Sequence, residues 1–182
     1  MKLISRANIV QDINHTLKRN DFLVGVLGGT SFDAHYGARF LENKNINTLP
    51  MGVSSSPIEQ TVLQLSKKKL MTRIIEIIDI LLLKKCSIIF IYCNSLSVSL
   101  DLIMLRKKVR IPIITTIDFY NSIAINEKSI AVMAANCQSL ASIEKIMLKT
   151  NPNIIIIGFA ALNIVDDIEK EILPGELIEK YD

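Results

Sequence analysis

The sequence predicts an α/β fold of parallel-sheet βαβ units, in two pseudo-symmetric halves with a cleft between them and with the second half incomplete. Short apolar runs alternate along the chain with longer segments of helical periodicity. The run Ser87–Ile91 is continuously apolar after its first residue, which is typical of a strand buried on both faces of a parallel sheet. The strand–turn–helix pattern of the first half also recurs in the second.

An amphipathic helix is predicted at the N-terminus, and we treat residues 1–20 as a separate segment. Apolar side chains recur on one helical stripe of residues 3–18, while charged and polar side chains occupy the rest. His15 lies in this segment and is interpreted as a surface residue. We expect the helix to pack on the main body or on a partner.

The first strand is predicted at Phe22–Leu27, followed by Gly28-Gly29-Thr30-Ser31 and a helix to about Asn43. A strand, a glycine turn and a helix in this order direct backbone N–H groups toward an anion. The glycine spacing does not match the dinucleotide-binding fingerprint, and the turn has no P-loop lysine, so a small carboxylate is favoured over a nucleotide. A tight turn without a ligand explains the glycines equally well.

A second strand is predicted at Thr48–Val53. Residues 56–59 carry a helix start, with serine at the N-cap, proline at the first helical position and glutamate at the third. We expect this helix to continue to about Lys84. Ser54 and Ser55 are left at the carboxyl end of the strand, where their hydroxyl groups could hold a ligand.

The central strand, Ser87–Ile91, brings Cys93 to its carboxyl end. In parallel sheets, ligands bind in the crevice beyond the carboxyl ends of the strands, so Cys93 is a candidate catalytic thiol. A helix is predicted over Leu96–Lys108, with Ser95 and Ser97 available as caps. The alternative is that Cys93 is a buried structural thiol, which is the commoner fate of a lone cysteine.

The rest of the chain continues the alternation of strands and helices. Polar side chains gather again at a carboxyl edge, at Thr115, Thr116 and Asp118. We place a first α/β domain at residues 21–118 and a partial second domain at residues 119–182. The elements expected are strands at Ile111–Thr116, Ser129–Ala134 and Ile154–Gly158, and helices from Gln138 to about Lys149 and over Ile164–Ile172.

An internal repeat supports the two related halves. Val24–Ser31 aligns without a gap on Ile130–Cys137, and at the same offset Gly52 lies over Gly158. The match is one of pattern rather than identity, and any two βαβ units of similar length would look somewhat alike. By the same offset, the counterpart of Cys93 would fall beyond the last residue, Asp182.

Composition excludes several classes of protein. Cys86, Cys93 and Cys137 form no CxxC pair and no Cys/His cluster, so neither a disulfide framework nor a metal site is expected. A net charge of +3 and the absence of tryptophan argue against nucleic-acid binding. No apolar run reaches the length of a membrane span, and the first residues lack a signal-peptide pattern. We therefore expect a cytoplasmic protein without a membrane partner.

Several of these segments resemble the aspartate/glutamate racemase superfamily, whose members work without a cofactor. The most specific is Ile91-Tyr92-Cys93-Asn94-Ser95, which is similar to the first cysteine motif of that family. The likeness covers roughly residues 22–172. It also includes the opening strand and loop Val24–Thr30, the second loop Ser55–Pro57, the strand Ile111–Ile114, the start of the second domain at Ile130–Asn136 and the helix Ile164–Glu169.

The resemblance implies a chemistry. In that family two cysteines face each other across a cleft, and one removes the α-proton of an amino acid while the other delivers a proton to the opposite face. By resemblance, Cys93 is one acid/base and the substrate is a small amino acid or dicarboxylate such as aspartate or glutamate. The substrate-binding residues implied are Gly28, Gly29, Thr30, Asn94, Ser95 and, less strongly, Ser54, Ser55 and Asn136.

The chain also departs from the family pattern. The Asp-Ser pair of the first loop in glutamate racemases is replaced by Gly28-Gly29, which favours the aspartate-racemase side. The second motif, Gly-Cys-Thr, does not occur, and the chain resembles a C-terminally shortened member. Cys137, at a predicted helix N-terminus, could serve as the second base because such a position lowers the pKa of a thiol. Filling space against the helix start is the alternative for Cys137.

Three further interpretations remain open. A single-thiol relative, such as a decarboxylase that protonates a carbanion on one face, needs only Cys93. A degenerate, non-catalytic protein would bind a carboxylate or a protein partner through the retained half. A redox thiol protein is disfavoured, because Cys93 has no evident resolving partner in the sequence. An unclosed second half would expose apolar strand edges, so we expect a homodimer.

Overall fold

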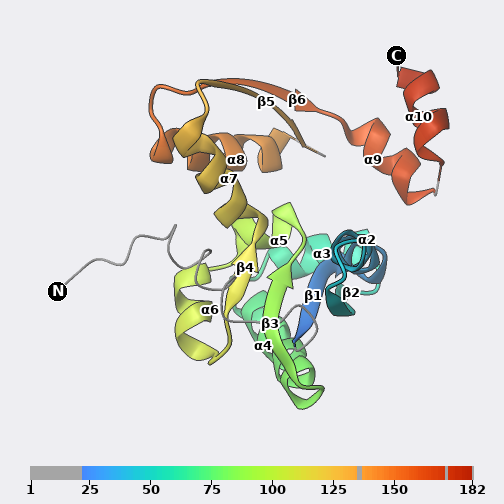
Figure 1. Ribbon diagram of the computed structural model, residues 1–182, viewed down its shortest axis with the longest axis vertical. Helices are drawn as coiled ribbons and strands as arrows, with labels where there is room; N and C mark the ends of the chain where they lie inside the picture. The colour runs from blue at the N-terminus through green and yellow to red at the C-terminus, as the bar shows by residue number, and fades with distance from the viewer. Residues whose placement is uncertain (1–21, 135–136, 171, 182) are drawn as a thin grey trace.

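The computed structural model describes residues 22–134, 137–170 and 172–181. Within them the chain has the predicted α/β architecture, in which parallel strands alternate with helices (Figure 1). The predicted N-terminal helix, including His15, lies outside the described residues, as does Asn136. None of the described helices is long and apolar enough to cross a membrane.

The first four strands form one parallel sheet. They are β1 (Leu23–Thr30), β2 (Asn47–Ser54), β3 (Cys86–Ile91) and β4 (Ile113–Thr115), in the order β2-β1-β3-β4. Because β1 and β3 are central, most of their residues are buried, as their apolar sequences predict.

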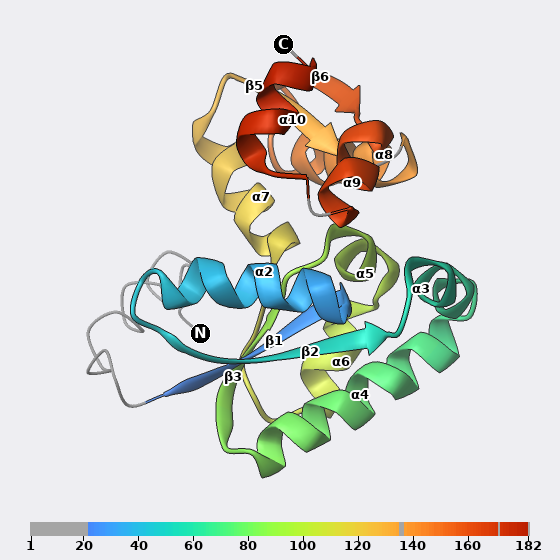
Figure 2. The same ribbon diagram turned by 90° about the vertical axis from the view of Figure 1, so that its right-hand side faces the viewer.

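Helices cover both faces of this sheet. Helix α2 (Ser31–Glu42) lies on one face, where Ala38 packs with the strand residues Val24 and Val26 (Figure 2). Helix α4 (Lys67–Leu83) lies on the other and contributes more residues to the larger core than any other element. That core includes Ile74, Ile78 and Leu81 of α4 together with Leu27, Ile89 and Ile91 of the strands.

The first glycine pair is not a turn, contrary to the sequence-based expectation. Strand β1 continues through Gly28 and Gly29 to Thr30, and no glycine in the described residues has a positive φ. The glycines are needed for close approach instead. A Cβ on Gly28 would lie 2.2 Å from the backbone nitrogen of Ala34 in α2.

Two predicted helices are each split in two. The segment expected as one helix to Lys84 contains α3 (Pro57–Gln64) and α4, because the Ser66 hydroxyl accepts a hydrogen bond from the backbone of Lys69 and caps a new helix. The segment expected from Leu96 contains α5 (Asn94–Ser99) and α6 (Leu102–Lys108), and Asp101 caps α6. Helix α5 also begins before Ser95 and Ser97, so neither serine is its N-cap.

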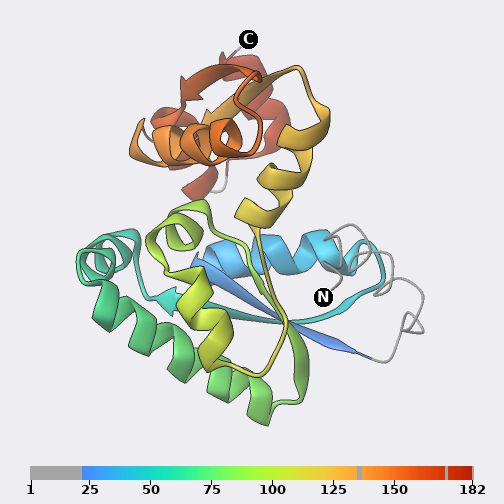
Figure 3. The ribbon, with the colours of Figure 1, turned by 90° about the vertical axis from the view of Figure 1, so that its left-hand side faces the viewer.

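A helix that the sequence analysis missed joins the first sheet to the rest of the chain. Thr115 and Asp118 form a reciprocal capping box that starts α7 (Thr116–Asn126) directly after β4. These residues had been interpreted only as polar groups at a sheet edge. Figure 3 shows α7 running from the first sheet to the second group of strands and helices.

The second group of strands repeats the first in part. Strands β5 (Ser129–Ala134) and β6 (Ile155–Ala160) pair in parallel and are connected by α8 (Cys137–Thr150). They fall at the positions that the internal repeat places over β1 and β2. The register differs, because Gly28 pairs with Gly52 whereas Gly158 pairs with Val132 rather than with Ala134.

Only one face of this second sheet is covered within the described residues. Helix α8 packs on one face through Ile143 and Met147. The opposite face is apolar and exposed, and it consists of Ala131, Met133, Ile155, Ile157 and Phe159.

The boundaries of the two domains expected from the sequence, at residues 21–118 and 119–182, stay a prediction.

Two short helices end the described chain. They are α9 (Leu162–Glu169), which starts and ends earlier than predicted, and α10 (Pro174–Tyr181), which the sequence analysis did not expect. The carboxylate of Asp167, on α9, accepts hydrogen bonds from Lys180 and Tyr181 of α10. These bonds tie the two helices together.

Candidate active site

Cys93 lies where the sequence predicted it, at the carboxyl end of β3. The backbone N–H of Tyr92 still bonds to the carbonyl of Leu27 in β1, and Cys93 then takes the N-cap position of α5. The residue is half-buried. Its sulfur is 3.3 Å from the hydroxyl oxygen of Ser95 and 3.6 Å from the side-chain nitrogen of Gln60.

Ser95 is the centre of a small polar cluster. Gln60 donates a hydrogen bond of 2.8 Å to its hydroxyl oxygen, and Gln64 donates a second of 3.2 Å. Both glutamines are on α3, where a spacing of four residues places them on one face. Helix α3 therefore brings two neutral donors to the end of β3.

The surroundings of Cys93 oppose ionisation in part and favour it in part. Burial raises the pKa of the Cys93 thiol above its ordinary value, and the negative charge of Asp33 raises it further. Hydrogen bonds from Ser95, from the backbone N–H of Leu96 and from Gln60 lower it. Because the net direction is upward, the thiol holds its proton at neutral pH in this structure.

Asp33 lies beside the loop that the sequence predicts to bind a carboxylate. It is the third residue of α2 and forms a capping box with Thr30, whose backbone N–H bonds to its carboxylate. Burial raises the pKa of Asp33, while hydrogen bonds from the backbones of Thr30 and Gly29 lower it. The backbone N–H groups of Thr30 and Gly29 thus already bond to a carboxylate of the chain itself, and the role of Gly28, Gly29 and Thr30 toward a ligand stays a prediction.

The two predicted serines of the second loop also have partners. The hydroxyl of Ser54 is buried and donates to the carbonyl oxygens of Gly29 and Ser56. Ser55 is exposed, and both its backbone N–H and its hydroxyl bond to Glu59. Both serines therefore shape the loop between β2 and α3 in this structure, and their role toward a ligand stays a prediction.

Asn94 connects the site to the second part of the chain. Its side-chain oxygen accepts a hydrogen bond of 2.9 Å from the hydroxyl of Tyr120 on α7. Burial raises the pKa of Tyr120, and hydrogen bonding to Asn94 lowers it. Helix α5 also contacts α8, so α7 and α8 both pack against the helix that carries Asn94 and Ser95.

Cys137 is the first residue of α8 and is exposed. No hydrogen bond or electrostatic interaction in the described part of the chain joins it to Cys93. Its neighbour Asn136 lies outside the described residues. The role of Cys137 as a second base and the role of Asn136 in substrate binding therefore stay predictions. Cys86 is buried.

Four residues of the candidate site were not predicted from the sequence: Gln60, Gln64 and Asp33, which act on Cys93 or Ser95, and Tyr120, which bonds to Asn94. The two glutamines could have been found, because they lie four residues apart on the helix that starts at the predicted second loop. Asp33 had a signal as well, since a Thr-x-x-Asp pattern predicts a capping box. Tyr120 had none, because its helix was not predicted.

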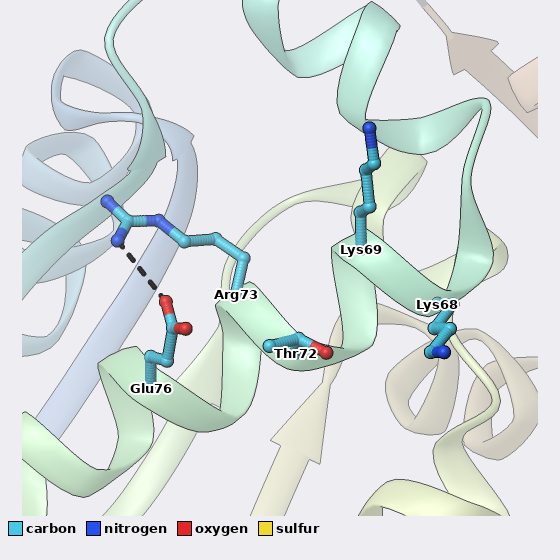
Figure 4. A pocket seen from close by; sticks show the side chains of 5 residues that line it. All are labelled: Lys68, Lys69, Thr72, Arg73 and Glu76. Atoms are coloured by element: carbon cyan, nitrogen blue, oxygen red, sulfur yellow. Dashed lines mark ion pairs between the residues drawn. The ribbon is translucent and has the colours of Figure 1, made fainter.

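A second surface feature is separate from this cluster. Lys68, Lys69, Thr72, Arg73 and Glu76 line an open depression on α4 (Figure 4). Arg73 is already bonded there to Glu76 and to the backbone of Val53. Among the described residues no group of three or more histidines, cysteines and acidic side chains could hold a metal ion.

Comparison with solved structures identifies the fold. The chain is similar to glutamate racemase from Francisella tularensis in complex with D-glutamate, with a TM-score of 0.55, 20% identity and coverage of 82% of this chain and 56% of that one. For glutamate racemase from Campylobacter jejuni, the TM-score is 0.58 at 18% identity, and the match covers 87% of this chain and 64% of that one. For arylmalonate decarboxylase, the TM-score is 0.53 at 11% identity, and the match covers 79% of this chain and 67% of that one. No protein-family model and no curated protein sequence matches the chain.

The chain therefore shares the fold of these glutamate racemases and of arylmalonate decarboxylase, as the resemblance of its motifs predicted. At these identities the similarity shows the fold alone. The chain spans between about half and two thirds of the length of the racemases it matches. Activity and substrate are therefore taken up below as proposals.

Proposed function

We propose that the protein is a cofactor-independent racemase, or a close relative of one, in which Cys93 acts as acid/base at the α-carbon of a small amino acid. The observation that carries the proposal is the position of this thiol. It lies at the carboxyl end of a central parallel strand, half-buried, with Ser95 and Gln60 directed at its sulfur.

The donors around Cys93 suit the chemistry. Proton transfer at an α-carbon passes through a carbanion, whose charge spreads onto the substrate carboxylate and must be stabilised by positioned donors. Ser95, Gln60 and Gln64 supply neutral hydroxyl and amide groups, and the start of α5 supplies backbone N–H groups. Aspartate and glutamate are the substrates we propose, by analogy with the racemase fold.

The protonation state of Cys93 supports a second candidate function. A thiol with a raised pKa is a proton donor at neutral pH, which is the role required of a single thiol that quenches a carbanion after decarboxylation. Arylmalonate decarboxylase shares this fold, with 11% identity to the chain. A malonate derivative is therefore the alternative substrate class.

Cys137 remains our proposal for the second base in the racemase. Its exposed position at the start of α8 leaves the thiol accessible. Two-base chemistry requires a group on the other face of the α-carbon, so loss of Cys137 would abolish inversion but spare a one-sided proton exchange. Packing against the helix start is the alternative, and it predicts no kinetic effect.

The experiment is a comparison of two assays on wild type, Cys93→Ser and Cys137→Ser. Chiral chromatography follows conversion of L- and D-aspartate and L- and D-glutamate, and carbon dioxide release follows an arylmalonate. Racemisation that disappears in Cys93→Ser supports the first function, and carbon dioxide release that disappears in the same variant supports the second. Neither activity in a folded sample would leave the non-catalytic binding protein as the better account.

A further inference from the structure

Three polar groups surround the hydroxyl oxygen of Ser95. The side-chain nitrogen of Gln60 is 2.8 Å away, that of Gln64 is 3.2 Å away, and the sulfur of Cys93 is 3.3 Å away. The two amide nitrogens can only donate, whereas the sulfur and the hydroxyl can each donate or accept. The direction of the hydrogen bond between Ser95 and Cys93 is therefore set by the other two contacts.

A serine hydroxyl has one hydrogen and two lone pairs. Gln60 and Gln64 each donate an N–H to the Ser95 oxygen, so both lone pairs are used. The hydroxyl hydrogen is then left for the third neighbour, which is the Cys93 sulfur. A thiolate can only accept hydrogen bonds, so this orientation favours the ionised form of Cys93.

We propose that Gln60 and Gln64 are positioning residues that fix the Ser95 hydroxyl as a hydrogen-bond donor to the Cys93 sulfur. Gln60 has a second contact, since its side-chain nitrogen is also 3.6 Å from that sulfur. Gln64 acts through Ser95 alone. The proposal gives α3 a function at the site and rests on the proposed role of Cys93 as an acid/base.

Gly29, near the end of β1, leaves space for the side chain of Gln60. A Cβ built on Gly29 would lie 2.1 Å from the side-chain oxygen of Gln60. Gly29 has no positive φ, so a left-handed backbone does not explain the glycine. The missing side chain instead gives the Gln60 carboxamide room beside the strand, within reach of Ser95 and Cys93.

One charged group from a neighbouring element acts on the same sulfur. Asp33 of α2 opposes ionisation of Cys93 through its negative charge. The phenols of Tyr92, which follows β3, and Tyr120 of α7 are the other titratable groups nearby, and burial raises the pKa of both. With these groups unchanged, the glutamines can be tested separately.

The test is the pH dependence of Cys93 alkylation by iodoacetamide, followed by peptide mass spectrometry. Gln64→Leu is expected to raise the pKa of Cys93 by about half a unit and Gln60→Leu by about one unit, the size of effect expected for lost hydrogen bonds to a charged acceptor. Gln64→Glu is expected to raise it further than Gln64→Leu, because a carboxylate accepts the Ser95 hydrogen and turns it away from sulfur.

The controls separate this role from a general structural one. Gln138 is an exposed glutamine on α8, and Gln138→Leu is expected to leave the Cys93 profile unchanged. The exposed Cys137 is alkylated in the same sample and reports any change in the reagent or in overall folding. Alkylation measures the thiol itself, so the result does not depend on whether the protein racemises an amino acid.

A double-mutant cycle with Ser95→Ala decides the mechanism. If Gln64 acts through the serine, Gln64→Leu has no further effect on the Cys93 pKa once Ser95 is alanine. An equal effect of Gln64→Leu with and without Ser95 would overturn the proposal. A Gln64→Leu profile identical to wild type, or a Gln64→Glu profile at lower pKa than Gln64→Leu, would overturn it as well.

Discussion

At the scale of single residues, opposing effects act on the pKa of the Cys93 thiol. Burial and Asp33 keep Cys93 protonated, while Ser95, Gln60 and the backbone of Leu96 favour the thiolate. A residue that must both give and take a proton needs such a balance, because either form must be reachable during turnover.

These opposing effects predict how the alkylation of Cys93 depends on pH. We expect Cys93 alkylation in the unliganded protein to have its midpoint above the value of about 8.5 that is usual for a free thiol. Asp33→Asn should lower the midpoint, because a neutral amide no longer repels the thiolate. Asp79→Asn, on the exposed side of α4, is the matched control and should have no effect. A midpoint unchanged in Asp33→Asn would contradict this account of the electrostatics.

A second prediction concerns Gly29. In Gly29→Ala the new methyl group would meet the side chain of Gln60, which can move only by leaving Ser95 and the Cys93 sulfur. We expect the pKa of Cys93 to rise by about one unit, as for loss of the Gln60 hydrogen bonds. Gly175→Ala is the control, because nothing lies within 4 Å of a Cβ at that position. An unshifted alkylation profile in Gly29→Ala would show that Gln60 does not need the space.

At the scale of secondary structure, the sequence predicted the strands well and the helix ends poorly. The strands could be predicted because each is a short apolar run, whose length is typical of a strand buried in a parallel sheet. Helix breaks depend on single caps such as Ser66 and Asp101, which compete with an apolar pattern that continues across them. Helix α7 was missed because the residues of its capping box were interpreted only as polar groups at a sheet edge.

The capping box of α7 gives the third prediction. Thr115→Val keeps the volume of a buried side chain but removes the hydroxyl that bonds to Asp118. We expect the free energy of unfolding, measured in urea, to fall by about 1–2 kcal/mol. Thr72→Val on the exposed face of α4 is the control and should change it by less than about 0.5 kcal/mol. Equal stability of the two variants would mean that the box does not hold α7 in place.

At the scale of the whole molecule, α7 and α8 bring the second part of the chain onto the helix that carries Asn94 and Ser95 (Figure 3). The sequence predicted the position of Cys93 because it follows directly from the order of the strands. Local patterns mark Gln60 and Asp33 on their own helices, but they do not show that α3 and α2 bring these two side chains to the same sulfur. Their approach is decided by packing rather than by local pattern.

The homodimer predicted from the sequence gives the fourth prediction. Parallel sheets are normally covered on both faces, whereas Met133, Ile157 and Phe159 of the second sheet are each more than half exposed. We expect sedimentation equilibrium to show self-association that Ile157→Lys weakens. Ile103→Lys, at an exposed position on α6, is the control and should leave it unchanged. A monomer at every concentration would contradict the prediction.

The central claim, that Cys93 transfers a proton at the α-carbon of an amino acid, is tested most directly by solvent-deuterium exchange. Wild type and Cys93→Ala are incubated in D₂O with L- and D-aspartate or glutamate, and NMR follows loss of the α-proton signal. We predict incorporation of deuterium by the wild type and none by Cys93→Ala. Exchange at the same rate in both proteins, or no exchange by a folded wild type with any of the four amino acids, would contradict the claim.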